Sequence, residues 1–119
     1  MSKRLAIAVG LLAAGCGGAG LGAETRADIT ARMRSAQQPI ASCYRTGLAG
    51  NRKLAGTMVL AFAAAPTTGQ FQDIKVSSDD LGDPAVQRCV IDEVGKLKLE
   101  KPQATRLSIS YPIRFTPNN

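Results

Sequence analysis

Three cysteines are the most reactive side chains of this chain, and their positions predict two kinds of chemistry. Cys16 ends the run Leu11-Leu12-Ala13-Ala14-Gly15-Cys16, where a thiol can take up a diacylglycerol. Cys43 and Cys89 lie far downstream, each in a segment with helical spacing, where two thiols can be oxidised to a disulfide. Histidine is absent, so the chain lacks the commonest general base near neutral pH and the commonest metal ligand.

The other candidate catalytic groups are neighbours in sequence: Asp79-Asp80, Asp92-Glu93 and Ser77-Ser78. Adjacent side chains on a helix do not face one site, and a serine nucleophile needs a base beside it. The acidic run that ends at Asp83 lacks the ligand spacing of a calcium-binding EF-hand loop and is better explained by a turn and a helix cap. We therefore expect no catalytic site, no metal, no cofactor and no small-molecule substrate.

The N-terminal segment has the pattern of an export signal. Lys3 and Arg4 precede ten apolar residues at 5–14, whereas a membrane-spanning helix needs about 20. Residues 13–16 resemble the lipobox of a bacterial lipoprotein, with Cys16 as the acylated residue. This interpretation makes residues 1–15 the signal peptide and 16–25 a lipidated glycine-rich tether, facing the periplasm from the outer membrane. The alternative is ordinary cleavage after Ala23, which would give a secreted or soluble periplasmic protein.

The composition indicates one small domain, at residues 26–117, with no nucleic-acid partner. The chain carries 15 basic and 9 acidic residues, and the basic ones are scattered along it. Nucleic-acid-binding proteins usually concentrate positive charge on one face, often with stacking aromatic side chains. This chain has three phenylalanines, two tyrosines and no tryptophan. A solvated surface explains the charge better.

Hydrophobic periodicity predicts the order helix, strand, strand, helix, strand. Apolar residues at helical spacing run from Ile29 to Leu48, with Pro39 predicting a kink or the start of a second helix. Alternating patterns at 56–65 and 71–77 predict a hairpin, and the stripe at 86–97 predicts a helix capped by Asp83. A last strand spans 106–115, where Pro112 argues against a central position. The expected fold is α+β, with two helices on one face of a three-stranded antiparallel sheet.

Cys43 and Cys89 both fall on the apolar sides of their segments. If both helices pack on the same sheet, a disulfide between the two residues is feasible, and export would favour it. Such a bond typically adds about 2–4 kcal/mol of stability. The alternative is two free, buried cysteines that act as small hydrophobic side chains.

An ordered set of residues resembles a known family. The set comprises Ile40-Ala41-Ser42-Cys43-Tyr44, Leu48, residues 54–59, Gly69, Val76-Ser77-Ser78, Leu81-Gly82-Asp83, Val86, Cys89-Val90 and Tyr111-Pro112-Ile113-Arg114-Phe115. It resembles the TonB C-terminal-like modules of myxobacterial envelope and gliding-motility proteins, of the AgmX/PglI type. The resemblance implies a TonB/TolA-like fold and a paired disulfide. Residues 97–102 depart from it, because relatives often carry an aromatic-proline pair there.

These observations predict a non-catalytic, lipid-anchored periplasmic binding or adaptor module of the cell envelope. Its partners would be the membrane, through Cys16, and an envelope protein. By analogy with TonB-like modules, the partner would add a strand to the edge of the last strand, at Leu107, Ile109 and Tyr111. The alternative is a structural or assembly subunit of a motility or secretion complex.

Overall fold

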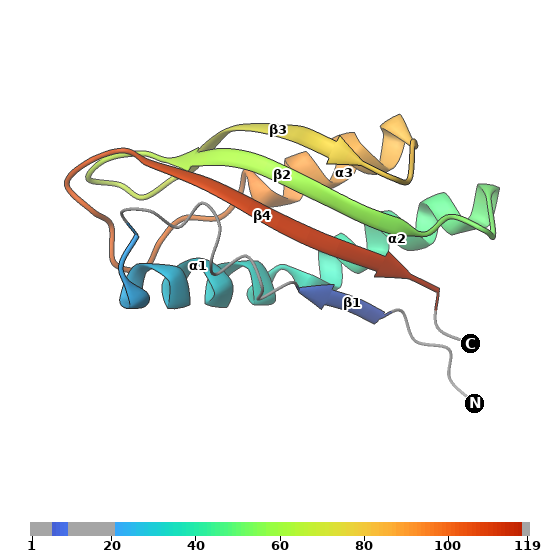
Figure 1. The fold of residues 1–119 in the computed structure, drawn as a ribbon, viewed down its shortest axis with the longest axis horizontal. Coiled ribbons are helices and arrows are strands. Elements are labelled where there is room, and N and C mark those ends of the chain that lie inside the picture. Colours follow the sequence, from blue (N-terminus) through green and yellow to red (C-terminus); the bar gives the residue numbers. More distant parts are fainter. Residues whose placement is uncertain (1–5, 10–20, 118–119) are drawn as a thin grey trace.

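The protein folds as helices packed against an antiparallel sheet, as the computed structural model shows (Figure 1). It describes residues 21–117 and the backbone of residues 6–9. Within these ranges the helices are α1 (Ala23–Ser35), α2 (Gln37–Gly50) and α3 (Pro84–Val94). The strands are β1 (Ala6–Val9), β2 (Gly56–Ala64), β3 (Phe71–Asp79) and β4 (Leu107–Thr116). The predicted α+β class is confirmed.

The sheet has the order β1-β4-β2-β3, with every pair antiparallel. The predicted three strands form its main part, with β2 paired on one side to β3 and on the other to β4. The fourth strand was not expected, since Ala6–Val9 lies in the segment interpreted as an export signal. It pairs with β4 from Ala6↔Thr116 to Val9↔Ile113. The expectation that Pro112 keeps the last strand out of a central position is therefore wrong, because β4 lies between β1 and β2, although the described pairing with β1 stops at the residue after the proline.

One face of the sheet carries the core. Along β4 the side chains alternate between buried and exposed, the period of a strand with one covered face. Ile113 and Phe115 are buried, whereas Arg114 between them is exposed. The ring of Phe115 lies 5.0 Å from the ring of Tyr44 on α2. Burial raises the pKa of Tyr44, whose hydroxyl donates a hydrogen bond to the Leu54 carbonyl.

The first helical region is divided into two helices at Ala36. Ile29 and Met33 of α1 and Ile40 of α2 are all buried, so the predicted apolar stripe continues across the break. Pro39 lies in the first turn of α2, where the absence of its amide hydrogen removes no intrahelical bond. The second helix thus begins two residues before the proline that predicted it.

α3 begins as its sequence predicts. The Asp83 carboxylate accepts hydrogen bonds from the amides of Ala85 and Val86, at 3.0 and 3.1 Å, and Pro84 is the first helical residue. The helix is shorter than the apolar stripe, however. It ends at Val94, and the Leu97 amide instead donates to the Val94 carbonyl in a tight turn.

Candidate functional site

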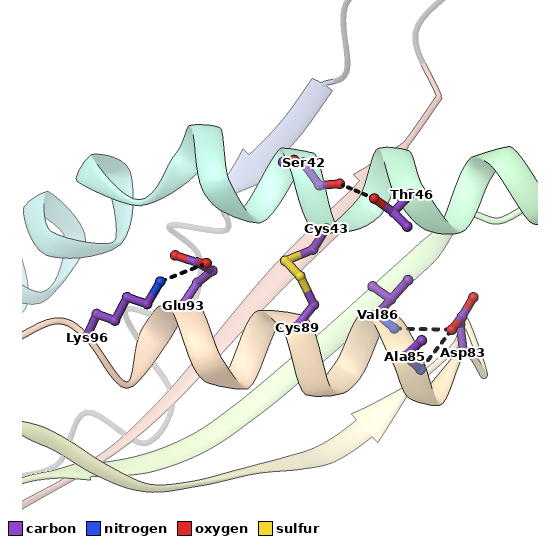
Figure 2. The surroundings of a disulfide bond; sticks show 9 residues. All are labelled: Ser42, Cys43, Thr46, Asp83, Ala85, Val86, Cys89, Glu93 and Lys96. Carbon is purple, nitrogen blue, oxygen red and sulfur yellow. Dashed lines mark hydrogen bonds and ion pairs between the residues drawn. A yellow bond between two sulfur atoms is a disulfide. The ribbon is translucent and has the colours of Figure 1, made fainter.

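The disulfide joins α2 to α3 (Figure 2). Cys43 and Cys89 are bonded, with their Cα atoms 5.7 Å apart, as the sequence predicted. Cys43 is buried and Cys89 is half-buried. One turn along α2, Gly47 allows the close approach of the two helices, since a Cβ there would lie 2.5 Å from Val86 Cγ2. The covalent bond and the glycine fix how the helices cross.

A shallow hollow lies beside the disulfide, between the C-terminal half of α2 and the start of α3. Its volume is about 350 Å³, and the two bonded cysteines, Gly47 and Val86 contribute to its lining. The polar side chains at its rim are Thr46, Asn51 and Asp83. Asp83 is engaged in capping α3, and Thr46 donates to the Ser42 carbonyl, so both already have a structural role.

The acidic residues singled out in the sequence are held by local backbone hydrogen bonds. Asp79 accepts from the amides of Leu81 and Gly82 at 2.9 and 3.2 Å, and also from the side chain of Gln87. Asp80 accepts a 3.4 Å bond from the Thr57 amide. Across residues 21–117, no cluster of three or more side chains has the arrangement of a metal site. The turn-and-cap interpretation of this acidic run is therefore confirmed.

The other two candidate catalytic pairs, Asp92-Glu93 and Ser77-Ser78, also make contacts that serve the fold. Glu93 forms an ion pair with Lys96 at 3.2 Å, while Asp92 beside it is exposed. The Ser77 hydroxyl donates to the Val59 carbonyl of the neighbouring strand. Neither contact joins a serine to a base that could activate it.

The β3 edge of the sheet carries features that discourage strand addition. The β2–β3 register shifts twice, and each shift leaves one extra residue on β3. Near the first of these along β3, Asp73 has a φ of 54°, a conformation that breaks regular strand geometry. Asp73 and Lys75 are exposed, and Asp73 forms a 2.9 Å ion pair with Arg106. Bulges and charged side chains are the usual protection of an exposed edge.

The β4 edge is regular. Its register with β2 runs without a shift from Gly56↔Phe115 to Ala64↔Leu107, and it is the edge that β1 joins. Hydrogen bonds identify the outward-facing backbone groups. The Thr57 carbonyl accepts from the Asp80 amide on the β3 side, so Arg114, which lies opposite Thr57, has its backbone groups turned away from β2.

The same alternation orients the rest of β4. Residues two apart on a strand present their backbone groups to the same side, so those of Ser110, Pro112 and Arg114 face outward. Pro112 has no amide hydrogen, and this orientation costs the ladder to β2 no hydrogen bond. On the outer edge, however, Pro112 leaves a gap in the row of donors. The sequence showed this proline but gave no signal for which edge it would interrupt.

The three residues predicted to bind a partner lie N-terminal to that gap. Ile109 and Tyr111 are each 5% exposed and Leu107 is half-buried, so their side chains belong mainly to the core. Burial raises the pKa of Tyr111, while the nearby Thr30 hydroxyl and Arg34 charge act in the opposite direction. Thr30 and Arg34 belong to α1, which lies on the same side of β4 as β1 (Figure 1). In this stretch a partner would therefore meet the backbone and the exposed side chains of Ser108 and Ser110 rather than the predicted side chains.

Cys16 and residues 17–20 of the predicted tether lie outside the described residues. The last part of the tether, residues 21–25, is described, and helix α1 already begins there, at Ala23. None of the helices in the described part of the chain has the length and hydrophobicity needed to cross a bilayer.

Comparison with protein-family models, curated proteins and solved structures returns no match.

Proposed function

We propose that this protein is a non-catalytic adaptor of the bacterial envelope, anchored by a lipid at Cys16 and recruiting a protein partner by strand addition to β4. The observation that carries the proposal is the contrast between the two edges of the sheet. The β3 edge is interrupted by bulges and charged side chains, whereas β4 keeps an unshifted register with β2 and, beyond Pro112, pairs with an additional strand. An edge that accepts a strand is a site for an extended segment of another protein.

The rest of the described domain fits this role. Asp79, Asp83 and Glu93 are engaged in a turn, a helix cap and an ion pair, and the hollow beside the disulfide is lined by polar groups that already serve the fold. The resemblance to TonB C-terminal-like modules supports the same reading, because those modules present a small α+β domain to partner proteins. We place the domain in the periplasm, attached to the outer membrane.

Acylation is tested on protein isolated from its native membrane. We expect its intact mass to correspond to a chain that begins at Cys16 and carries diacylglycerol, because a thioether survives reducing agents. The Cys16→Ser variant should lose the label from a clickable fatty acid and leave the membrane fraction. Several buried acyl chains bind a bilayer stably, at about 0.8 kcal/mol per methylene, so the loss should be nearly complete. A native mass without lipid would contradict the anchor.

Partner recruitment is tested by site-specific photocrosslinking in cells. A photoreactive amino acid replaces Ser110 or Arg114, both exposed on β4, or, as the control, Arg88, exposed on α3. We expect the two β4 positions to give the same covalent adduct with an envelope protein, and Arg88 to give at least about tenfold less, because strand addition places the partner within reach of β4 alone. Equal adducts at Arg88, or none at β4, would reject the proposed function.

A further inference from the structure

Residues 6–9 occupy part of the edge that the proposed function assigns to a partner. We propose that this segment is a removable occupant of the stretch Ile113–Thr116, which an uncharged extended segment of the partner takes over once the leader is cut off. This inference rests on the proposed function. It adds the location of the acceptor on β4, the direction and chemistry of the incoming strand, and a step that controls access.

The backbone geometry fixes how a strand binds there. Because the backbone groups of Arg114 face outward, the antiparallel pair Ala8↔Arg114 exchanges both amide–carbonyl hydrogen bonds. Ala6↔Thr116, two residues along, is the equivalent pair. On β1, therefore, the backbones of Ala6 and Ala8 face β4, and those of Ile7 and Val9 face away.

The acceptor stretch lies C-terminal to the one expected from the sequence. Pro112 supplies no donor to the outer edge, and α1 approaches Tyr111 on the N-terminal side of this gap. β1 instead pairs beyond the proline, from Ile113 onward. The proline thus marks where the half of β4 that takes a strand begins.

The chemistry of the occupant follows from its sequence and surroundings. Ala6–Val9 reads Ala-Ile-Ala-Val, with no charged or hydrogen-bonding side chain. β1 also lies close to α2, and the neighbouring β4 residues Ile113 and Phe115 are 1% and 0% exposed. The partner segment that replaces β1 is therefore an uncharged strand of the same kind.

Access is controlled by cleavage. Both predicted cleavage positions, before Cys16 and after Ala23, separate residues 6–9 from the domain. The edge is therefore covered while the chain retains its leader and is free once export is complete. A chain that has not yet been exported could not pair with strands of other proteins in the wrong compartment.

The test uses the full chain with Cys16→Ser and a specific protease site in place of residues 17–20. The probe is a fluorescent synthetic peptide of residues 3–11, added to the uncut protein or to protein that has been cut and freed of its leader. Two further peptides carry N-methyl groups, one at Ala6 and Ala8 and the other at Ile7 and Val9. They match in composition and in the number of methyl groups.

We expect the unmodified peptide to bind cut protein at least about tenfold more tightly than uncut protein, because the tethered segment competes for the same edge. Methylation at Ala6 and Ala8 should weaken binding at least about tenfold, since it removes the two amides that donate to β4. Methylation at Ile7 and Val9 should change affinity less than about threefold.

The proposal is overturned if both methylated peptides bind alike, if cutting leaves affinity unchanged, or if cut protein dimerises through β4 and leaves the peptide unbound. Failure of the peptides, together with crosslinks that persist at Ser110 and Arg114, would reject the removable occupant and leave the adaptor function standing. Peptides that bind as expected, together with an absence of crosslinks at Ser110 and Arg114, would support the removable occupant and reject the adaptor function.

Discussion

Breaking the Cys43–Cys89 disulfide should lower the free energy of unfolding by about 4 kcal/mol. The bond closes an interval of 46 residues, and the loop-entropy relation assigns this amount to a loop of that length. Small domains are stable by only about 5–15 kcal/mol, so the loss is a large share of the total. In thermal unfolding we expect a fall in Tm of roughly 4–8 °C for each kcal/mol lost.

Two samples separate the covalent bond from its packing. The Cys43→Ala, Cys89→Ala double variant lacks both sulfur atoms, whereas the reduced wild-type protein keeps them. Similar destabilisation of both would attribute the effect to the cross-link. Cys16→Ser serves as the control and should unfold like the oxidised wild type. A loss below about 1 kcal/mol in both samples would show that the packing at Gly47 and Val86 holds the helices without the bond.

Much of the fold follows from local patterns in the sequence. The hairpin, the capped start of α3 and the pairing of Cys43 with Cys89 each depend on residue types at short spacing or on export chemistry. The division at Ala36 was less certain, because Pro39 permits either a kink or a new helix. The early end of α3 was missed, since the apolar side chain of Leu97 continues the stripe although its backbone has left the helix.

The candidate site was harder to predict, because the edge of a sheet is the side of a strand that has no neighbouring strand. The sequence showed Pro112 and an alternating strand, but strand order decides which side of that strand is free. The partner residues were predicted by analogy with TonB-like modules, and their side chains point mainly into the core. The informative residues are Arg114 and Thr57, whose opposed positions reveal the direction of the backbone groups. No periodicity in the sequence carries that information.

Phe115→Ala should destabilise the protein by about 3–5 kcal/mol, the usual cost of removing a buried phenylalanine. The side chain is fully buried and packs on Tyr44, with ring centroids 5.0 Å apart and planes inclined by 42°. Its partner on β2 is Gly56, which has no side chain to fill the space left behind. The cavity would therefore stay open. Urea unfolding of Phe115→Ala measures the loss, with Arg114→Ala, at the exposed neighbour, as the control.

A double-mutant cycle with Tyr44→Leu and Phe115→Leu then isolates the ring contact. We expect a coupling energy of about 0.5–1.5 kcal/mol, the range for aromatic pairs beyond their buried area. If Phe115→Ala instead costs no more than Arg114→Ala, which should lie within about 0.5 kcal/mol of wild type, Phe115 does not anchor the C-terminal half of β4. The packing of Phe115 on Tyr44 would then not be what holds the β4 residues that pair with β1 in place.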